Sequence, residues 1–303
     1  MRRFIIITGP TASGKTKVSV EIAKAMHSRV ISADSMQIYK GMDIGTAKAT
    51  PVDMQGVVHE LIDIIDPDQD YSVAEFQKAA FSIIEAANAI EEIPVVAGGT
   101  GLYVNALIYD LNFGKTVRDD TIRLKMSQLA DDKSIDYLYN ILENKDPDYA
   151  KIIARNDKRR IIRRLELIES GEAGAYEFRK PNVTDDFVII GLTMNRELLY
   201  RRIEARVDEM ILLGLAEEAR HVYDKYGETT ALKAIGYKEL VAHFKGEITL
   251  NEAVALIKRN TRRFAKRQLT WFKRDERINW FEVGSCIEDT IHEIMLYIKR
   301  KGF

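Results

Sequence analysis

The chain has 303 residues, of which 46% are hydrophobic and 30% charged, and its formal net charge is −1. This composition excludes a disordered or fibrous protein, and the length predicts about two domains, one of which can be inserted into the other. The single cysteine, Cys286, excludes an intramolecular disulfide and a zinc cluster built on several cysteines. No apolar stretch approaches the ~20 residues of a membrane span, so we expect a cytoplasmic protein without a membrane partner.

A phosphate-binding loop lies near the start of the chain. The apolar run 4–7, a predicted strand, leads into Gly-Pro-Thr-Ala-Ser-Gly-Lys-Thr, and helical spacing follows to Met26. Glycine at both ends lets backbone N–H groups converge on an anion, and the helix N-terminus adds positive charge. Lys15 adds a mobile cation, and the Thr16 hydroxyl can bind magnesium. The residues expected to bind a nucleotide or diphosphate are Gly9, Pro10, Thr11, Ala12, Ser13, Gly14, Lys15 and Thr16.

Strand, turn and helix patterns alternate after this loop as far as about residue 110. Ser72 and Glu75 have the spacing of a capping box, which marks the start of an amphipathic helix. The alternation predicts an α/β fold with a P-loop NTPase-like parallel sheet flanked by helices. The predicted elements are, in order, a strand over 29–33, a loop over 35–50, a strand over 60–65, a helix over 72–87, a strand over 94–97 and a glycine turn over 98–101.

Strand patterns disappear between residues 116 and 180, where helical periodicity replaces them. Asp146 and Pro147 suit an N-cap and a first-turn proline, and Gly171 suits a helix C-terminus. We therefore expect an all-helical insertion domain over 116–180, within a core domain formed by 1–115 and 181–303. The last part is predicted to be mostly helical, with a strand over 187–192, helices over 195–213 and 216–226, and a long helix capped by Thr249 with Glu252.

Asp34 follows the second predicted strand, at the sheet edge where ligands bind in open α/β folds. Its carboxylate could bind magnesium, accept a proton from an attacking nucleophile, or only cap the next turn. Ser35 and Gln37 carry donors and acceptors that suit the edge of a base, although such residues also commonly form loops. The position alone leaves these readings open.

The glycine turn over 98–101 is a weaker motif than the first loop, because a tight strand-to-helix turn explains it equally well. A P-loop kinase usually has an acidic residue at the end of an apolar strand, where it holds magnesium. The strand over 94–97 ends in glycine instead.

Two clusters of basic residues occur in predicted helices. Together they indicate an anionic polymer as a partner, because phosphate contacts supply affinity and the aromatic residues among them can stack on bases. A solvated helix face is the alternative for each cluster alone. The clusters are Arg155, Lys158, Arg159, Arg160, Arg163 and Arg164, and Lys258, Arg259, Arg262, Arg263, Lys266, Arg267, Lys273, Arg274 and Arg277.

Arg206 lies at the border of an apolar helix face, where an arginine extending to the surface is the simplest interpretation.

Seven short strings of the sequence occur together, at positions 9–16, 34–39, 41–48, 98–103, 206–210, 234–239 and 261–272. They resemble strings of the bacterial tRNA dimethylallyltransferases, members of the tRNA isopentenyltransferase family. The resemblance extends from residue 4 to about residue 281 and is specific, since most of the strings are not general features of P-loop proteins. One departure is Arg164, where the family usually has alanine.

The resemblance implies transfer of a dimethylallyl group from its diphosphate to N6 of the adenosine next to the anticodon on its 3′ side. It implies that Asp34 is the general base, that Thr11, Lys15 and Arg206 bind the diphosphate, and that Thr16 binds Mg²⁺. The partners would be dimethylallyl diphosphate and the tRNA anticodon stem-loop, and the enzyme would be a monomer. The implied tRNA contacts are Asp34, Ser35, Met36, Gln37, Thr100, Arg123, Arg159, Arg160, Ile161, Ile162 and Arg163.

Two other functions fit the phosphate loop. A small-molecule P-loop kinase would transfer phosphate from ATP and would not need the second basic cluster. A non-catalytic RNA-binding NTPase switch would bind tRNA without alkylating it. We favour prenyl transfer because the strings at 34–39, 98–103 and 261–272 occur in one chain.

Overall fold

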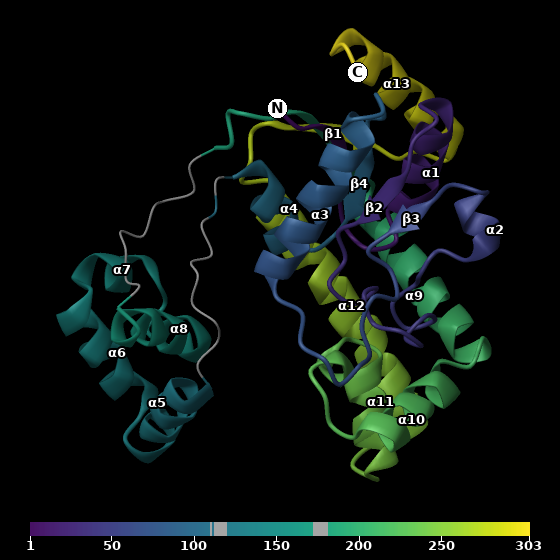
Figure 1. Cartoon of the computed structure of the whole chain (residues 1–303). Coiled ribbons are helices and arrows are strands. Elements are labelled where there is room, and N and C mark those ends of the chain that lie inside the picture. Colours follow the sequence, from purple (N-terminus) through teal and green to yellow (C-terminus); the bar gives the residue numbers. More distant parts are fainter. Residues whose placement is uncertain (110, 112–119, 172–180) are drawn as a thin grey trace. The chain divides into compact units, whose positions relative to one another are not determined.

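The computed structural model describes residues 1–109, 111, 120–171 and 181–303. The chain divides into two compact units, one formed by residues 1–108 and 182–303 and the other by residues 109–181 (Figure 1). The boundaries predicted at 115–116 and 180 lie outside the described residues. Among the described residues, no helix has the length and apolarity needed to cross a bilayer.

The larger unit is built on a six-stranded sheet with the strand order β3-β2-β4-β1-β5-β6, in which all neighbouring strands are parallel. This is the P-loop NTPase-like fold predicted from the sequence. Parallel strands need long crossover connections, which the intervening helices and loops provide. The strands are β1 (Arg3–Thr8), β2 (Val30–Ser32), β3 (His59–Glu60), β4 (Val95–Gly98), β5 (Asp186–Thr193) and β6 (Ile278–Glu282).

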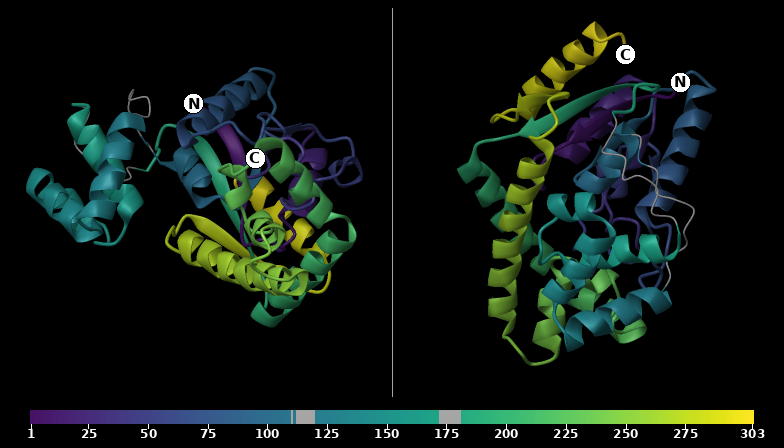
Figure 2. Two further views of the ribbon diagram at one scale, coloured as in Figure 1. Left: turned by 90° about the horizontal axis from the view of Figure 1, so that it is seen from below. Right: turned by 90° about the vertical axis from the view of Figure 1, so that its left-hand side faces the viewer.

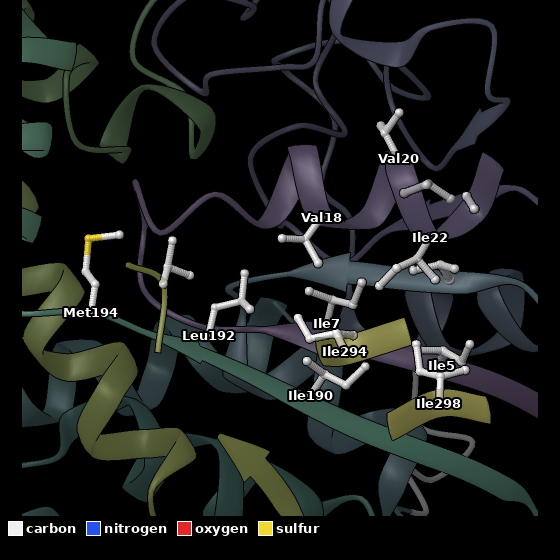
Figure 3. Packing of buried hydrophobic residues seen from close by; sticks show 14 of the residues in the cluster. Ile5, Ile7, Val18, Val20, Ile22, Ile190, Leu192, Met194, Ile294 and Ile298 are labelled. Carbon is white, nitrogen blue, oxygen red and sulfur yellow. The ribbon is translucent and has the colours of Figure 1, made fainter. Parts of the chain in front are cut away.

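Helices cover both faces of this sheet. Alternate residues of β1 and β5, such as Ile5, Ile7 and Ile190, pack on α1 (Lys15–Ala25) and α13 (Ile287–Arg300), as Figure 3 shows. The other face carries α3 (Val73–Asn88), next to α4 (Gly101–Ile108) (Figure 1). Burial of both faces explains why the central strands are apolar throughout.

A second group of helices packs around the buried ring of Tyr237 and closes the unit beyond the sheet. The long helix α12 (Leu250–Phe272) runs from this group back to the sheet (Figures 1 and 2). Its predicted capping box is present, because the side chain of Thr249 accepts from the backbone N–H of Glu252. The group contains α9 (Arg196–Leu212), α10 (Leu215–Tyr226), the 3₁₀ turn η1 (Ala231–Lys233), α11 (Tyr237–Phe244) and α12. The short helix α2 (Pro51–Met54) lies earlier in the chain, between β2 and β3.

One predicted strand was wrong, and one strand was not predicted. The strand predicted over 60–65 is only the two residues His59–Glu60, because Leu61 and Asp63 have positive φ angles of 62° and 55° that break the extended ladder. The C-terminal part also contains β6, which extends the sheet beside β5 and which its surrounding charged residues concealed.

The smaller unit is helical in its described residues, with a core of its own. Asp146 caps α7 by accepting from the N–H of Tyr149 at 3.0 Å, and Pro147 is in the first turn, as predicted. Gly171 follows the last described helix with φ 72°. The helices are α5 (Asp120–Asp132), α6 (Ile135–Lys145), α7 (Pro147–Ile152) and α8 (Lys158–Glu169).

Candidate active site

The phosphate loop connects β1 to α1, as predicted. Gly9 has φ 146°, and a Cβ there would lie 2.6 Å from the carbonyl oxygen of Leu192 on the neighbouring strand, so only glycine fits. Helix α1 has no side-chain cap at Gly14, which leaves its N-terminal N–H groups free to bind an anion. Lys15 Nζ donates to the carbonyl oxygens of Gly9 at 3.1 Å and Pro10 at 2.8 Å.

A cavity of about 800 Å³ opens at the carboxyl edge of the sheet, in front of this loop. It brings together groups that are far apart in the sequence, including Asp34 after β2 and Arg206 on α9. Arg206 is exposed between the buried residues Ile203 and Val207, which is the border position predicted for it. The predicted site residues on the cavity wall are Thr11, Ala12, Ser13, Gly14, Lys15, Thr16, Asp34, Gln37 and Arg206.

Asp34 is half-buried, and its carboxylate has a local partner as well as access to the cavity. Its Oδ1 accepts from the N–H of Met36 at 2.9 Å, which is the capping contact considered from the sequence. Burial raises the pKa of Asp34, while the Met36 N–H and the charge of Lys15 oppose that rise. Burial lowers the pKa of Lys15 to about 8, and Asp34 opposes that shift. The cavity therefore holds a carboxylate and an amine with altered proton affinities, a pattern common at catalytic sites.

Three other residues predicted to contact tRNA lie on the loops next to Asp34, namely Ser35, Gln37 and Thr100. The hydroxyl of Thr100 accepts from the N–H of Ser35 at 3.0 Å, which ties the glycine turn to the start of the loop over 35–50. The amide of Gln37 accepts from Ser32 at 2.9 Å and donates to the carbonyl oxygens of Thr46 and Ala47. Gln37 thus braces the loop with both ends of its amide in this structure.

Two residues that the sequence did not single out shape the cavity wall over 43–48. The carboxylate of Glu218, on α10, accepts from the backbone N–H groups of Asp43, Ile44 and Gly45 at 2.8–3.0 Å. It also accepts from the hydroxyl of Tyr237 at 2.6 Å. Lys48 Nζ is enclosed and donates to the carbonyl oxygen of Tyr39. Glu218 lies in an ordinary helical stretch, and nothing in its local sequence indicates this role.

In the smaller unit, Arg159 and Arg160 are exposed on α8. Arg163 and Arg123 approach the same carboxylate oxygen of Glu166, which is fully buried, at 2.9 Å and 2.8 Å. The side chains of Arg123 and Arg163 are each 34% exposed, so all four arginines keep some surface that a phosphate backbone can contact.

Two expectations for α8 need correction. The side chain of Ile161 is fully buried in the core of the smaller unit, so it cannot reach a ligand at the surface. Arg164, which departs from the family pattern, does not add an exposed charge. It is buried, and its Nε donates to Asp146 Oδ2 at 2.6 Å.

The protein groups at the cavity can supply only some of the ligands of a magnesium ion. The described residues contain no group of three His, Cys, Asp or Glu side chains that could hold a metal by themselves. Thr16 is exposed at the start of α1, beside the N–H groups that suit an anion. Mg²⁺ keeps several waters and commonly binds through one or two protein ligands plus phosphate oxygens, so Thr16 with a bound diphosphate is a suitable set.

Comparison with known proteins gives one consistent result. The IPP transferase family profile matches residues 37–275. The chain is 48% identical over 287 residues to the tRNA dimethylallyltransferase of Carboxydothermus hydrogenoformans, covering 93% of this chain and 92% of that one. It is 46% identical over 311 aligned positions to the enzyme of the same name from Caldanaerobacter subterraneus subsp. tengcongensis, covering 99% and 98%.

Two solved structures show the same fold. The tRNA isopentenylpyrophosphate transferase of Bacillus halodurans has a TM-score of 0.76 and 42% identity, covering 99% of this chain and 97% of that one. A eukaryotic dimethylallyltransferase described as acting on tRNA has a TM-score of 0.81 and 27% identity, covering 94% and 75%. The profile match extends over most of the cavity wall and the whole smaller unit, and the chain belongs to the IPP transferase family.

Proposed function

We propose that this protein transfers a dimethylallyl group from dimethylallyl diphosphate to N6 of the tRNA adenosine that follows the anticodon on its 3′ side. One observation carries the proposal: the phosphate loop, Asp34 and Arg206 line a single cavity. A diphosphate-binding loop, a cation and a carboxylate are the groups that alkyl transfer to an amine requires. The proposed site needs no residue from a second copy of the chain, which is compatible with the monomer that the family resemblance implies.

The phosphate loop would bind the leaving group. As the bond between C1 of the isoprenoid and the diphosphate oxygen breaks, negative charge grows on that oxygen. The N–H groups at the start of α1, the hydroxyl of Thr11, and the cations Lys15 and Arg206 stabilise this charge more than that of the ground state. A magnesium ion held by Thr16 and the diphosphate would add further charge stabilisation.

Asp34 would accept the proton from the nucleophile. The lone pair of N6 forms the new bond to C1, the electrons of the C1–O bond leave with the diphosphate, and one N6 proton passes to the carboxylate of Asp34. Partial burial raises the pKa of this carboxylate, which makes it a better base than an exposed aspartate. An allylic carbon tolerates positive charge, so orientation and a proton acceptor are sufficient.

The proposed roles predict a bell-shaped pH profile of kcat/KM for the donor. Asp34 acts when ionised, so activity falls as the pH drops through its raised pKa. Lys15 acts when protonated, so activity falls as the pH rises through about 8. The profile of kcat/KM reports groups of the free enzyme. Changing Lys15 to arginine, which stays protonated, should remove the alkaline limb. An unchanged alkaline limb in Lys15→Arg would assign it to another group.

Two basic surfaces would bind the tRNA backbone. In the smaller unit the surface is formed by the exposed Arg159 and Arg160 of α8, together with the partly exposed Arg163 of α8 and Arg123 of α5. In the larger unit it is a row of basic residues along α12. The exposed basic residues of this row, on α12 and directly after it, are Arg259, Arg263, Lys266, Arg267, Lys273 and Arg274. The target adenosine would have to leave its stacked position to reach Asp34 inside the cavity, as in other enzymes that modify bases.

Changing Arg163 to alanine should weaken tRNA binding and lower the slope of log Kd against log salt by about 0.7–0.9, the value expected for loss of one phosphate contact. The measurement is tRNA affinity at several salt concentrations. Lys151→Ala is the matched control, because Lys151 is an exposed cation of the same unit outside the proposed surface. An unaltered slope in Arg163→Ala would remove Arg163 from the contact surface.

The position of the modified base gives a direct test of the proposed function. An unmodified anticodon stem-loop RNA with adenosine at the 3′ side of the anticodon should gain isoprenoid carbon from dimethylallyl diphosphate with Mg²⁺. The same RNA with guanosine there should gain none, since guanine has an oxygen at C6 where adenine has the N6 amine. Equal incorporation into both RNAs would contradict the proposed target.

A further inference from the structure

We propose that Gln268 is a positioning residue that fixes the distance between the phosphate loop and the loop that carries the base. It lies on α12, between the exposed cations Arg267 and Lys273, but its own side chain faces inward and is 5% exposed. The inference rests on the proposed prenyl transfer, and it assigns a role to a buried polar group that the mechanism above does not use.

Both ends of the Gln268 amide are bound, each to a different catalytic loop. Oε1 accepts from the N–H of Thr11 in the phosphate loop at 2.8 Å. Nε2 donates to the carbonyl oxygen of Gly99 in the glycine turn at 3.0 Å. The partners define which end is oxygen and which is nitrogen, because an N–H group needs an acceptor and a carbonyl needs a donor. One side chain thus joins two loops that follow the neighbouring strands β1 and β4.

The glycine turn is shaped to receive α12. A Cβ on Gly99 would lie 2.2 Å from Nε2 of Gln268, and a Cβ on Gly101 would lie 2.3 Å from the indole nitrogen of Trp271. Both glycines therefore permit a close approach of the backbone to one face of the helix. The glycine turn, which the sequence alone left ambiguous, serves here as a docking site for α12.

The connection continues from the glycine turn to the proposed base. Gly99 is followed by Thr100, whose hydroxyl accepts from the N–H of Ser35 at 3.0 Å. Ser35 is the residue after Asp34. A displacement of α12 relative to either loop would therefore change the distance between the leaving group at Thr11 and the base at Asp34. Small errors in such a distance reduce alkyl transfer, because the reacting atoms must be held close and in line.

The variant Gln268→Glu tests this role through pH. The neutral acid can accept from Thr11 and donate to Gly99, so it reproduces both bonds. The ionised form has no donor and places negative charge against the Gly99 carbonyl oxygen. We expect kcat of Gln268→Glu, relative to wild type, to be near one at the acid end and to fall about 10–100-fold as the introduced carboxyl ionises, which corresponds to one lost bond plus the repulsion.

The affinity for inorganic diphosphate with Mg²⁺ is a second readout and does not depend on catalysis. It should fall several-fold over the same pH range in Gln268→Glu, because the ionised side chain is repelled by the Gly99 carbonyl oxygen and displaces the N–H of Thr11 that it still binds. Gln268→Met, which keeps the volume but makes neither bond, should show a lowered kcat at every pH. Asn251→Glu adds a carboxyl to an exposed site on the same helix and should follow wild type throughout.

The outcomes separate this inference from the proposed function. A kcat ratio for Gln268→Glu that stays constant across the pH range, with unchanged diphosphate affinity, would overturn the positioning role. A kcat for Gln268→Met within twofold of wild type would do the same. A wild-type enzyme that transfers no isoprenoid would instead contradict the proposed function, and the diphosphate affinities of the same variants would still decide the role of Gln268.

Discussion

Changing Asp34 to asparagine should lower kcat for isoprenoid transfer by about 10²–10⁴-fold, the usual contribution of a general base. Asparagine keeps an oxygen that can accept from the N–H of Met36, so the local turn is preserved. It cannot accept a proton at neutral pH. The variant therefore separates the two readings of Asp34, as catalytic base and as cap.

The affinity for inorganic diphosphate should remain close to that of wild type in Asp34→Asn, because the leaving group is bound by the phosphate loop. The exposed residue Asp68 gives the matched control, since Asp68→Asn removes one carboxylate from a residue that does not line the cavity. A rate within threefold of wild type would leave Asp34 only its capping role. Single-turnover kinetics are the suitable measurement, because they isolate the chemical step from product release.

Changing Lys15 to methionine should reduce kcat/KM for the isoprenoid diphosphate by about 10²–10³-fold, as removal of one preorganised donor does in other enzymes. Nζ of Lys15 lies over the phosphate loop, where it donates to two backbone carbonyl oxygens. Methionine has a similar length but no charge, so the anion loses its mobile cation. Both kcat and the donor KM should be affected, since the charge on the diphosphate grows in the transition state but is already present in the ground state.

Lys17→Met is the matched control for Lys15→Met. Lys17 lies two residues further along the chain, is exposed, and pairs with Glu288 on α13. Its loss should change donor kinetics by less than a few-fold, because exposed ion pairs contribute little. Steady-state kinetics with the donor varied at saturating tRNA make the comparison. Equal losses in the two variants would mean that general positive charge, and not the position of Lys15, binds the donor.

Local sequence patterns predicted much of the fold. The phosphate loop and the capping box of Ser72 with Glu75 depend on contacts within a few residues, and both are present. The strand over 60–65 was mispredicted because its apolar pattern does not reveal the left-handed backbone of Leu61 and Asp63. The strand β6 was missed because charged residues surround its short apolar pattern, and its pairing with β5 is visible only in the folded chain.

In the candidate site too, local patterns were predictable and contacts between distant parts of the chain were not. Residues in contiguous motifs could be named from the sequence, and many of them line the cavity. Gln268 and Glu218 could not be given roles, because the partners of Gln268 at Thr11 and of Glu218 at Asp43 lie 257 and 175 residues away. Gln268 was part of a string that resembles the family, but only the folded chain brings it to the phosphate loop.

In the proposed reaction, a loop built to bind phosphates serves the transfer of carbon. A donor labelled with ¹⁴C in the isoprenoid and with ³²P in the diphosphate tests it most directly. After incubation with unmodified tRNA and Mg²⁺, we predict ¹⁴C in the tRNA, attached to N6 of the adenosine next to the anticodon, and all ³²P in free diphosphate. Incorporation of ³²P into tRNA, or no transfer of ¹⁴C, would contradict the account.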